Sequence, residues 1–144
     1  MCRKLSAHYI FPANRPPLKR GVVVVKNDGA IIDIIDTKGE LQESERLEFF
    51  DGIITPSFLP GIDHPENETQ FSILEEMKTY HKNFSHISLQ DIIKWRTINA
   101  AKARGFENIL GTISIGKKPG LNLITNIDFD KMQLTSQSEV IVIG

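Results

Sequence analysis

The stretch from Thr97 to Asn126 places the narrowest limits on how this chain can fold. It reads TINAAKARGFENILGTISIGKKPGLNLITN, which predicts the end of a helix, a glycine stop, a tight turn and a short apolar strand. Gly105 stands directly after the helical residues, where a left-handed C-cap is expected. A chain of 144 residues of this kind is most simply one domain around one core.

Short apolar segments between turns dominate the first third of the chain. Five of them predict strands, namely Leu5–Phe11, Gly21–Lys26, Ala30–Asp36, Arg46–Phe50 and Ile53–Thr55. Asn27-Asp28-Gly29 tolerates the positive φ of a hairpin turn, and Asp51-Gly52 predicts a second turn of the same type. Strands at this spacing indicate a small antiparallel sheet or sandwich.

The middle third has the three- and four-residue apolar spacing of helices. The first helix is predicted by a stripe of Phe71, Leu74, Met77, Tyr80 and Phe84. Its N-cap is expected at Thr69 or Asn67. Ser88 and Asp91 form a variant capping box that opens a second helix, which ends at Gly105.

The end of the chain returns to strands. The predicted segments are Gly111–Ile115, Leu121–Thr125 and Val140–Ile143. Neither the early nor the late strands alone bury enough apolar surface to be stable, so we expect both sets in one sheet system. The fold class is therefore α+β, a small antiparallel sheet or sandwich with two covering helices. Within the single domain 1–144 we expect strands in 1–58, helices in 59–105 and strands again in 106–144.

Composition and charge exclude several classes of protein. The chain is 40% hydrophobic and 24% charged, which fits a globular domain rather than a disordered one. No apolar run approaches the roughly 20 residues of a membrane helix, and the start MCRKLSAHYIFP is too polar for a signal-peptide core. The net charge of −1 gives no reason to expect nucleic acid. Cys2, the single cysteine, fits a reducing compartment, so we expect a cytoplasmic domain with neither membrane nor nucleic-acid partners.

The order of these motifs resembles the metal-dependent amidohydrolase superfamily, in particular its cytosine-deaminase and chlorohydrolase-like branch. In that branch a helix with T-x-N-x-A runs into L-G, then G-S/T-I, then G-K-x-A-D/G and an apolar strand, as in Thr97 to Asn126. The leading strands, including Asp51-Gly-Ile-Ile-Thr-Pro-Ser-Phe58, are also similar to those of the family. The resemblance implies a β-sandwich built from both ends of the chain. It also implies that Gly116 to Gly120 is a structural turn with positive φ at both glycines.

The family's catalytic body is largely missing from this chain. Family members carry a (β/α)8 barrel, which 144 residues cannot contain. Where the family continues into I-N-x-H-x-H, this chain reads Leu59-Pro-Gly-Ile-Asp-His64 and lacks the paired histidines. The segment from Gly61 to Lys78 instead resembles the one after the eighth barrel strand, G-T-D-S followed by L-S-I-L-x-E-M-K.

Asp63 is the one position that matches a catalytic residue of the family. By that resemblance it would bind a metal and shuttle a proton, with His64 as a possible second ligand. A catalytic zinc site takes three protein ligands and an open position. Two adjacent residues fall short of that set, so we expect Asp63 to cap a turn near Pro65 and the purified chain to hold no zinc or iron.

Three hypotheses about function follow. The first is a non-catalytic assembly or binding module, most simply a homodimer, because helices that pack on a barrel in relatives carry apolar surface that needs cover here. The predicted contact is the Phe71–Tyr80 stripe or the second helix. The second is a metal-dependent hydrolase acting on non-peptide C–N bonds, with zinc or iron held by Asp63 and histidines of two subunits. The third is a truncated product without a selected function. The substrate, if one exists, is not specified by the sequence.

Overall fold

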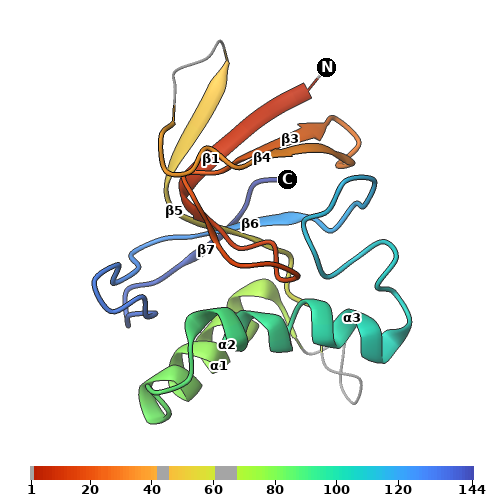
Figure 1. The fold of residues 1–144 in the computed structure, drawn as a ribbon. Helices are drawn as coiled ribbons and strands as arrows, with labels where there is room; N and C mark the ends of the chain where they lie inside the picture. Colours follow the sequence, from red (N-terminus) through yellow and green to blue (C-terminus); the bar gives the residue numbers. More distant parts are fainter. Residues whose placement is uncertain (1, 42–45, 61–67) are drawn as a thin grey trace.

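The computed structural model describes residues 2–41, 46–60 and 68–144 of the chain. Its strands are β1 (Cys2–Ile10), β2 (Leu18–Lys19), β3 (Val22–Lys26), β4 (Ile31–Ile35), β5 (Leu47–Pro56), β6 (Leu121–Ile124) and β7 (Val140–Val142). Its helices are α1 (Gln70–Asn83), α2 (Leu89–Trp95) and α3 (Ile98–Arg104). Figure 1 shows the helices grouped together on one side of the strands. None of these helices is long and apolar enough to cross a membrane.

All seven strands belong to one sheet, with the order β4-β3-β1-β5-β6-β7 and with β2 paired to the end of β1. The α+β class is confirmed, and so is the expectation that early and late strands share a sheet, because β5 pairs with β6. The sheet is mixed rather than purely antiparallel, since β1 and β5 run parallel. Parallel neighbours require a crossover, which here is the β2–β4 segment between them.

The turn predicted at Asp51-Gly52 is wrong, and β5 continues through it. Phe50 pairs with Ala7 and Ile53 with Tyr9, so two residues of β5 face the single residue His8 of β1. This is a β-bulge. Gly52 adopts φ 146° there, and a Cβ at this position would overlap the carbonyl oxygen of Ile124 on β6. An Asp-Gly pair favours a hairpin turn, but here it forms part of a β-bulge. Position 52 requires glycine because β6 approaches the backbone there too closely for a side chain.

The sheet has a separate apolar cluster on each face. The strand cluster contains Leu5, Ala7, Ile10, Leu18, Val23, Val25, Ile31, Ile54, Ile113, Leu121 and Leu123. The helix cluster, between the sheet and the helices, contains Phe11, Ile53, Phe58, Ile73, Leu74, Met77, Leu89, Ile92, Ile93, Ile124 and Ile127. Ile53 and Ile54 are neighbours in β5 but enter different clusters, as the alternation of a strand requires. Both faces of the sheet are thus covered within one chain.

The predicted helix caps are confirmed. The Thr69 hydroxyl accepts a hydrogen bond from the Ser72 N–H at 3.1 Å, and the Ser88 hydroxyl accepts one from the Asp91 N–H at 3.1 Å. Gly105 is left-handed, with φ 75°.

The second helix differs from expectation because it breaks into α2 and α3. At the break the Thr97 hydroxyl, fully buried, donates to the Ile93 carbonyl at 2.7 Å and competes with the helical ladder.

The strand predicted at Gly111–Ile115 is also wrong. No β-ladder includes this segment in the described part of the chain, and the Ile113 N–H instead donates to the Pro12 carbonyl at 3.0 Å. Gly111 has φ 92° and lies against α3, where an added Cβ would come within 2.6 Å of the Ala101 Cβ. Ile113 therefore packs in the cluster on the strand side of the sheet, and the segment does not pair as a strand.

Candidate functional site

The residues predicted to hold a metal, Asp63 and His64, lie outside the described residues. Among residues 2–41, 46–60 and 68–144, no group of three or more histidine, cysteine, aspartate or glutamate side chains is placed to hold a metal ion. The expectation that the chain holds no metal, and its alternative of zinc or iron at Asp63, both stay predictions.

The two ends of the segment that carries Asp63 are firmly held. On the near side, the Gln70 side chain bonds both backbone groups of Phe58, accepting from its N–H and donating to its carbonyl at 2.7 Å each. The Leu59 N–H donates to the Arg96 carbonyl at 2.7 Å, and Arg104 donates to the Pro60 carbonyl at 2.9 Å. These contacts tie residues 58–60 to all three helices.

On the far side, Arg96 reaches two carboxylates. Its guanidinium lies 2.9 Å from Glu68 and 2.9 Å from Glu76. Burial works against the charged form of Arg96, but the hydrogen bonds that it donates to both glutamates outweigh this effect and raise the pKa of the guanidinium. Arg96 therefore stays charged. It links the end of α2 to Glu68, which precedes α1, and to Glu76 within α1. Arg96, for which no sequence pattern indicated such a role, is thus an internal clamp.

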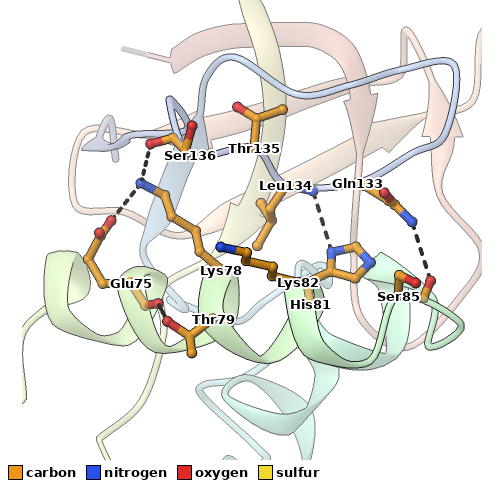
Figure 2. Close-up of a pocket in the computed structure, with 10 residues that line it drawn as sticks. All are labelled: Glu75, Lys78, Thr79, His81, Lys82, Ser85, Gln133, Leu134, Thr135 and Ser136. Carbon is orange, nitrogen blue, oxygen red and sulfur yellow. Dashed lines mark hydrogen bonds and ion pairs between the residues drawn. The ribbon is translucent and has the colours of Figure 1, made fainter.

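A cleft of about 450 Å³ opens between α1 and residues 133–136 (Figure 2). Lys78 spans it, pairing with Glu75 at 2.6 Å and donating to the Ser136 carbonyl at 3.4 Å. Gln133 donates to the Ser85 carbonyl at 3.3 Å at the other end. The bonds from Lys78 to Ser136 and from Gln133 to Ser85 cross the cleft, so they fasten the 133–136 segment to α1 and its C-terminal end.

His81 is the one imidazole buried in this cleft, with 3% of its surface exposed. Its Nδ1 accepts a hydrogen bond from the Leu134 N–H at 3.4 Å. Burial lowers its pKa, against the opposing effect of a hydrogen bond with the backbone of Ile87. The lowered pKa favours the neutral form of the ring, in which Nδ1 can accept the hydrogen bond from Leu134. No hydroxyl or carboxylate in the described chain is bonded to His81, so a nucleophile–base pair is absent here.

The turn expected at Gly116 to Gly120 is confirmed as structural. Gly116 has φ 90° and Gly120 has φ 75°. Its two lysines both have partners: Lys117 donates to the Thr112 hydroxyl at 2.8 Å, and Lys118 pairs with Asp28 on the surface at 3.3 Å. Cations already engaged in this way do not present the free cradle of a phosphate loop.

The predicted contact stripe on α1 divides between the inside and the outside of the molecule. Leu74 and Met77 are buried in the helix cluster, so they cannot form a contact with another molecule. Tyr80 lies on the α2 side of the helix, 4.6 Å from the Trp95 ring and 4.7 Å from the Phe84 ring between centroids. Trp95 is 38% exposed and Phe84 44% exposed. We call Tyr80, Phe84 and Trp95 the aromatic surface.

Comparisons with known proteins add little to this geometry. No protein-family profile matches the chain, and no curated protein matches its sequence. Among solved structures, ochratoxinase from A. niger is similar, with a TM-score of 0.32 and 13% sequence identity. The match covers 41% of this chain and 14% of the ochratoxinase chain. A likeness of this extent carries no functional argument, so function is argued from the residues themselves.

Proposed function

We propose that this chain is a non-catalytic, amidohydrolase-like module of the cytoplasm that assembles with a second copy of itself. The observation that carries the proposal is the aromatic surface. The Tyr80 ring of α1 contacts both Phe84, at the end of α1, and Trp95 of α2, and the Phe84 and Trp95 side chains are 44% and 38% exposed. Aromatic side chains clustered on a surface are enriched where proteins meet.

The inner contacts of the same helices support this assignment. Ile73, Ile92 and Ile93 each have at most 1% of their surface exposed and already bind the helix pair to the sheet. The aromatic surface is therefore not needed to attach the helices. A second copy of the chain is the simplest occupant for it, because an identical surface supplies the complementary aromatic rings in an isologous contact.

Sedimentation of single variants tests the proposed contact. Phe84→Lys introduces a charge at the centre of the contact and should halve the mass of the assembly. Ile115→Lys is the matched control, because Ile115 is 65% exposed on a loop away from the helices and its replacement should leave the mass unchanged. Equal masses for wild type and Phe84→Lys, with folding verified by circular dichroism, would contradict this contact.

The non-catalytic part of the proposal is supported by the sequence, which keeps Asp63 and lacks the paired histidines of the family. A metal held by one carboxylate stays mostly hydrated, so its water keeps a pKa far above neutrality. Elemental analysis of chelator-free protein gives the test. The proposal expects substoichiometric zinc and iron, whereas about one metal per chain that is lost in Asp63→Ala would favour the cross-subunit hydrolase.

A further inference from the structure

The sheet ends in two edges of different character, β4 and β7. The β7 edge is apolar on both sides from Val140 to Val142, and the nearest charged residue, Glu139, directly precedes the strand. Ile141 is 47% exposed and Val142 is 63% exposed, and they point to opposite faces because they are neighbours in a strand. An uncharged, apolar edge is the kind that pairs with another strand.

The hydrogen bonds around β7 identify which of its backbone groups are free. The Ile143 N–H donates to Leu121 and the Thr125 N–H donates to Glu139, at 2.9 Å each. Bonded pairs alternate along an antiparallel ladder, so the bonded pair between these two is Ile141 with Leu123. Val140 and Val142 therefore direct their N–H and C=O groups away from β6, to the side where the described chain has no further strand.

We infer that β7 pairs antiparallel with β7 of a second copy, with the two-fold axis at Ile141. Val140 of each copy then faces Val142 of the other, and the two pairs form four backbone hydrogen bonds. Ile141 faces its own counterpart as a non-bonded pair, where the Cα atoms of an antiparallel ladder approach to about 4.5 Å. The contact is isologous, as a two-fold axis requires.

The neighbouring registers are excluded by groups that are already bonded. A shift that centres the pair on Val140 places Val142 opposite Ser138, whose N–H donates to Thr135 at 3.1 Å. A shift that centres it on Val142 places Val140 opposite Gly144, whose N–H and C=O both bond Leu121. Of these three registers, only the one centred on Ile141 pairs Val140 with Val142 twice, so that unbonded backbone N–H and C=O groups meet each other in both pairs. A second copy is thus a better fit than an arbitrary extended peptide.

The other edge is protected against the same pairing. Ladder irregularity between Val24 and Val25 twists β4, and Asp33 places a carboxylate in the middle of the strand. The start of β4 is also covered, because Ile31 exchanges hydrogen bonds with Gly116 and Lys117. The contrast leaves β7 as the edge suited to assembly. This inference rests on the proposed self-association and adds a second surface to it, on elements separate from the aromatic surface.

Disulfide trapping tests the register directly. In a Cys2→Ser background, Ile141→Cys places two thiols opposite each other at a separation that a disulfide can span. Val142→Cys is the matched control, because in this register residue 142 faces residue 140 of the other copy. Mild oxidation should link most of the Ile141→Cys chains into dimers and few of the Val142→Cys chains. Equal linkage of both variants, or none of either, would overturn the register.

A proline variant separates this contact from the aromatic one. Val142→Pro removes an N–H that β6 does not use, so the fold should persist while two of the four intermolecular bonds are lost. Two separate isologous contacts hold four chains together in the wild type. We therefore expect the sedimenting mass to fall about twofold in Val142→Pro, and about twofold again in the double variant with Phe84→Lys. A wild-type dimer that Phe84→Lys dissociates and Val142→Pro leaves intact would refute the β7 contact alone. A monomeric wild type would refute both proposals.

Discussion

The helix pair α1–α2 has two apolar faces that differ in what covers them. The inner face, with Leu74 and Ile92 fully buried, packs against the sheet. The outer face holds the aromatic surface, where Phe84 and Trp95 remain more than a third exposed. A helix that stabilises only its own domain needs one apolar stripe. We propose that a second copy of the chain covers this outer face, so the two faces should respond differently to substitution.

The largest expected effect is the loss of inner-face packing. Leu74→Ala should lower the free energy of unfolding by about 2–5 kcal/mol, because it leaves a cavity between α1 and the sheet. Phe71→Ala on the same helix is the control, since Phe71 is 65% exposed and its loss should cost less than about 0.5 kcal/mol. Urea unfolding of both variants measures the difference. Similar costs would mean that the inner and outer faces are not distinct.

A glycine pair tests whether β5 and β6 are as closely packed as the β-bulge implies. Gly52→Ala should destabilise by more than about 2 kcal/mol, because its methyl group overlaps the Ile124 carbonyl as well as straining φ. Gly116→Ala has a positive φ but no atom within 4 Å, so it should cost only about 1 kcal/mol. Thermal unfolding of the two proteins gives the comparison, and an equal loss would argue against the bulge.

The Arg96 contacts that hold residues 58–60 and Glu68 should contribute less to the free energy of unfolding than the packing in the two preceding tests. Arg96→Met removes charge-assisted hydrogen bonds to Glu68 and Glu76 while keeping an unbranched apolar stem, and should cost about 1.5–3 kcal/mol. Glu76→Gln is the milder control, because the Glu76 side chain is 64% exposed. Limited proteolysis should show earlier cleavage near residues 58–60 in Arg96→Met. Unchanged stability and cleavage would show that Arg96 does not act as a clamp.

The smallest expected effect is a pH dependence from His81. Burial lowers its pKa in the folded chain, so below the ordinary pKa of about 6.5 the unfolded chain binds more protons than the folded one. Stability should therefore fall as the pH drops below about 6.5, by at most about 1.4 kcal/mol per pH unit from this group. Urea midpoints between neutral and mildly acidic pH measure the slope. His81→Gln should flatten it, and His86→Gln, at an exposed position, should not.

Several features of the fold could be predicted from local sequence because local interactions determine them. The caps at Thr69 and Ser88 each depend on a hydroxyl three residues from its partner, and Gly105 depends on its own backbone. The wrong predictions involve distant contacts. Gly52 is a bulge because β6 approaches it, and Gly111 is packed against α3, neither of which short-range patterns contain.

The site was less accessible to sequence reasoning than the fold. Periodicity grouped Leu74 with Tyr80, but their exposure differs because α2 and the sheet contact different sides of α1. Gln70 and Arg96 carried no motif, since their partners are backbone groups and carboxylates about 10 to 40 residues away. The free groups of β7 depend on the alternation of its pairing with β6, which only the register reveals.

The mass of the wild-type chain in solution tests the central claim of self-association most directly. One chain has a mass of 16.2 kDa. Sedimentation equilibrium at micromolar concentration should give at least twice this value, and the mass should fall in Phe84→Lys while Ile115→Lys matches the wild type. A wild-type protein that sediments as a 16.2 kDa monomer over that range would contradict the account.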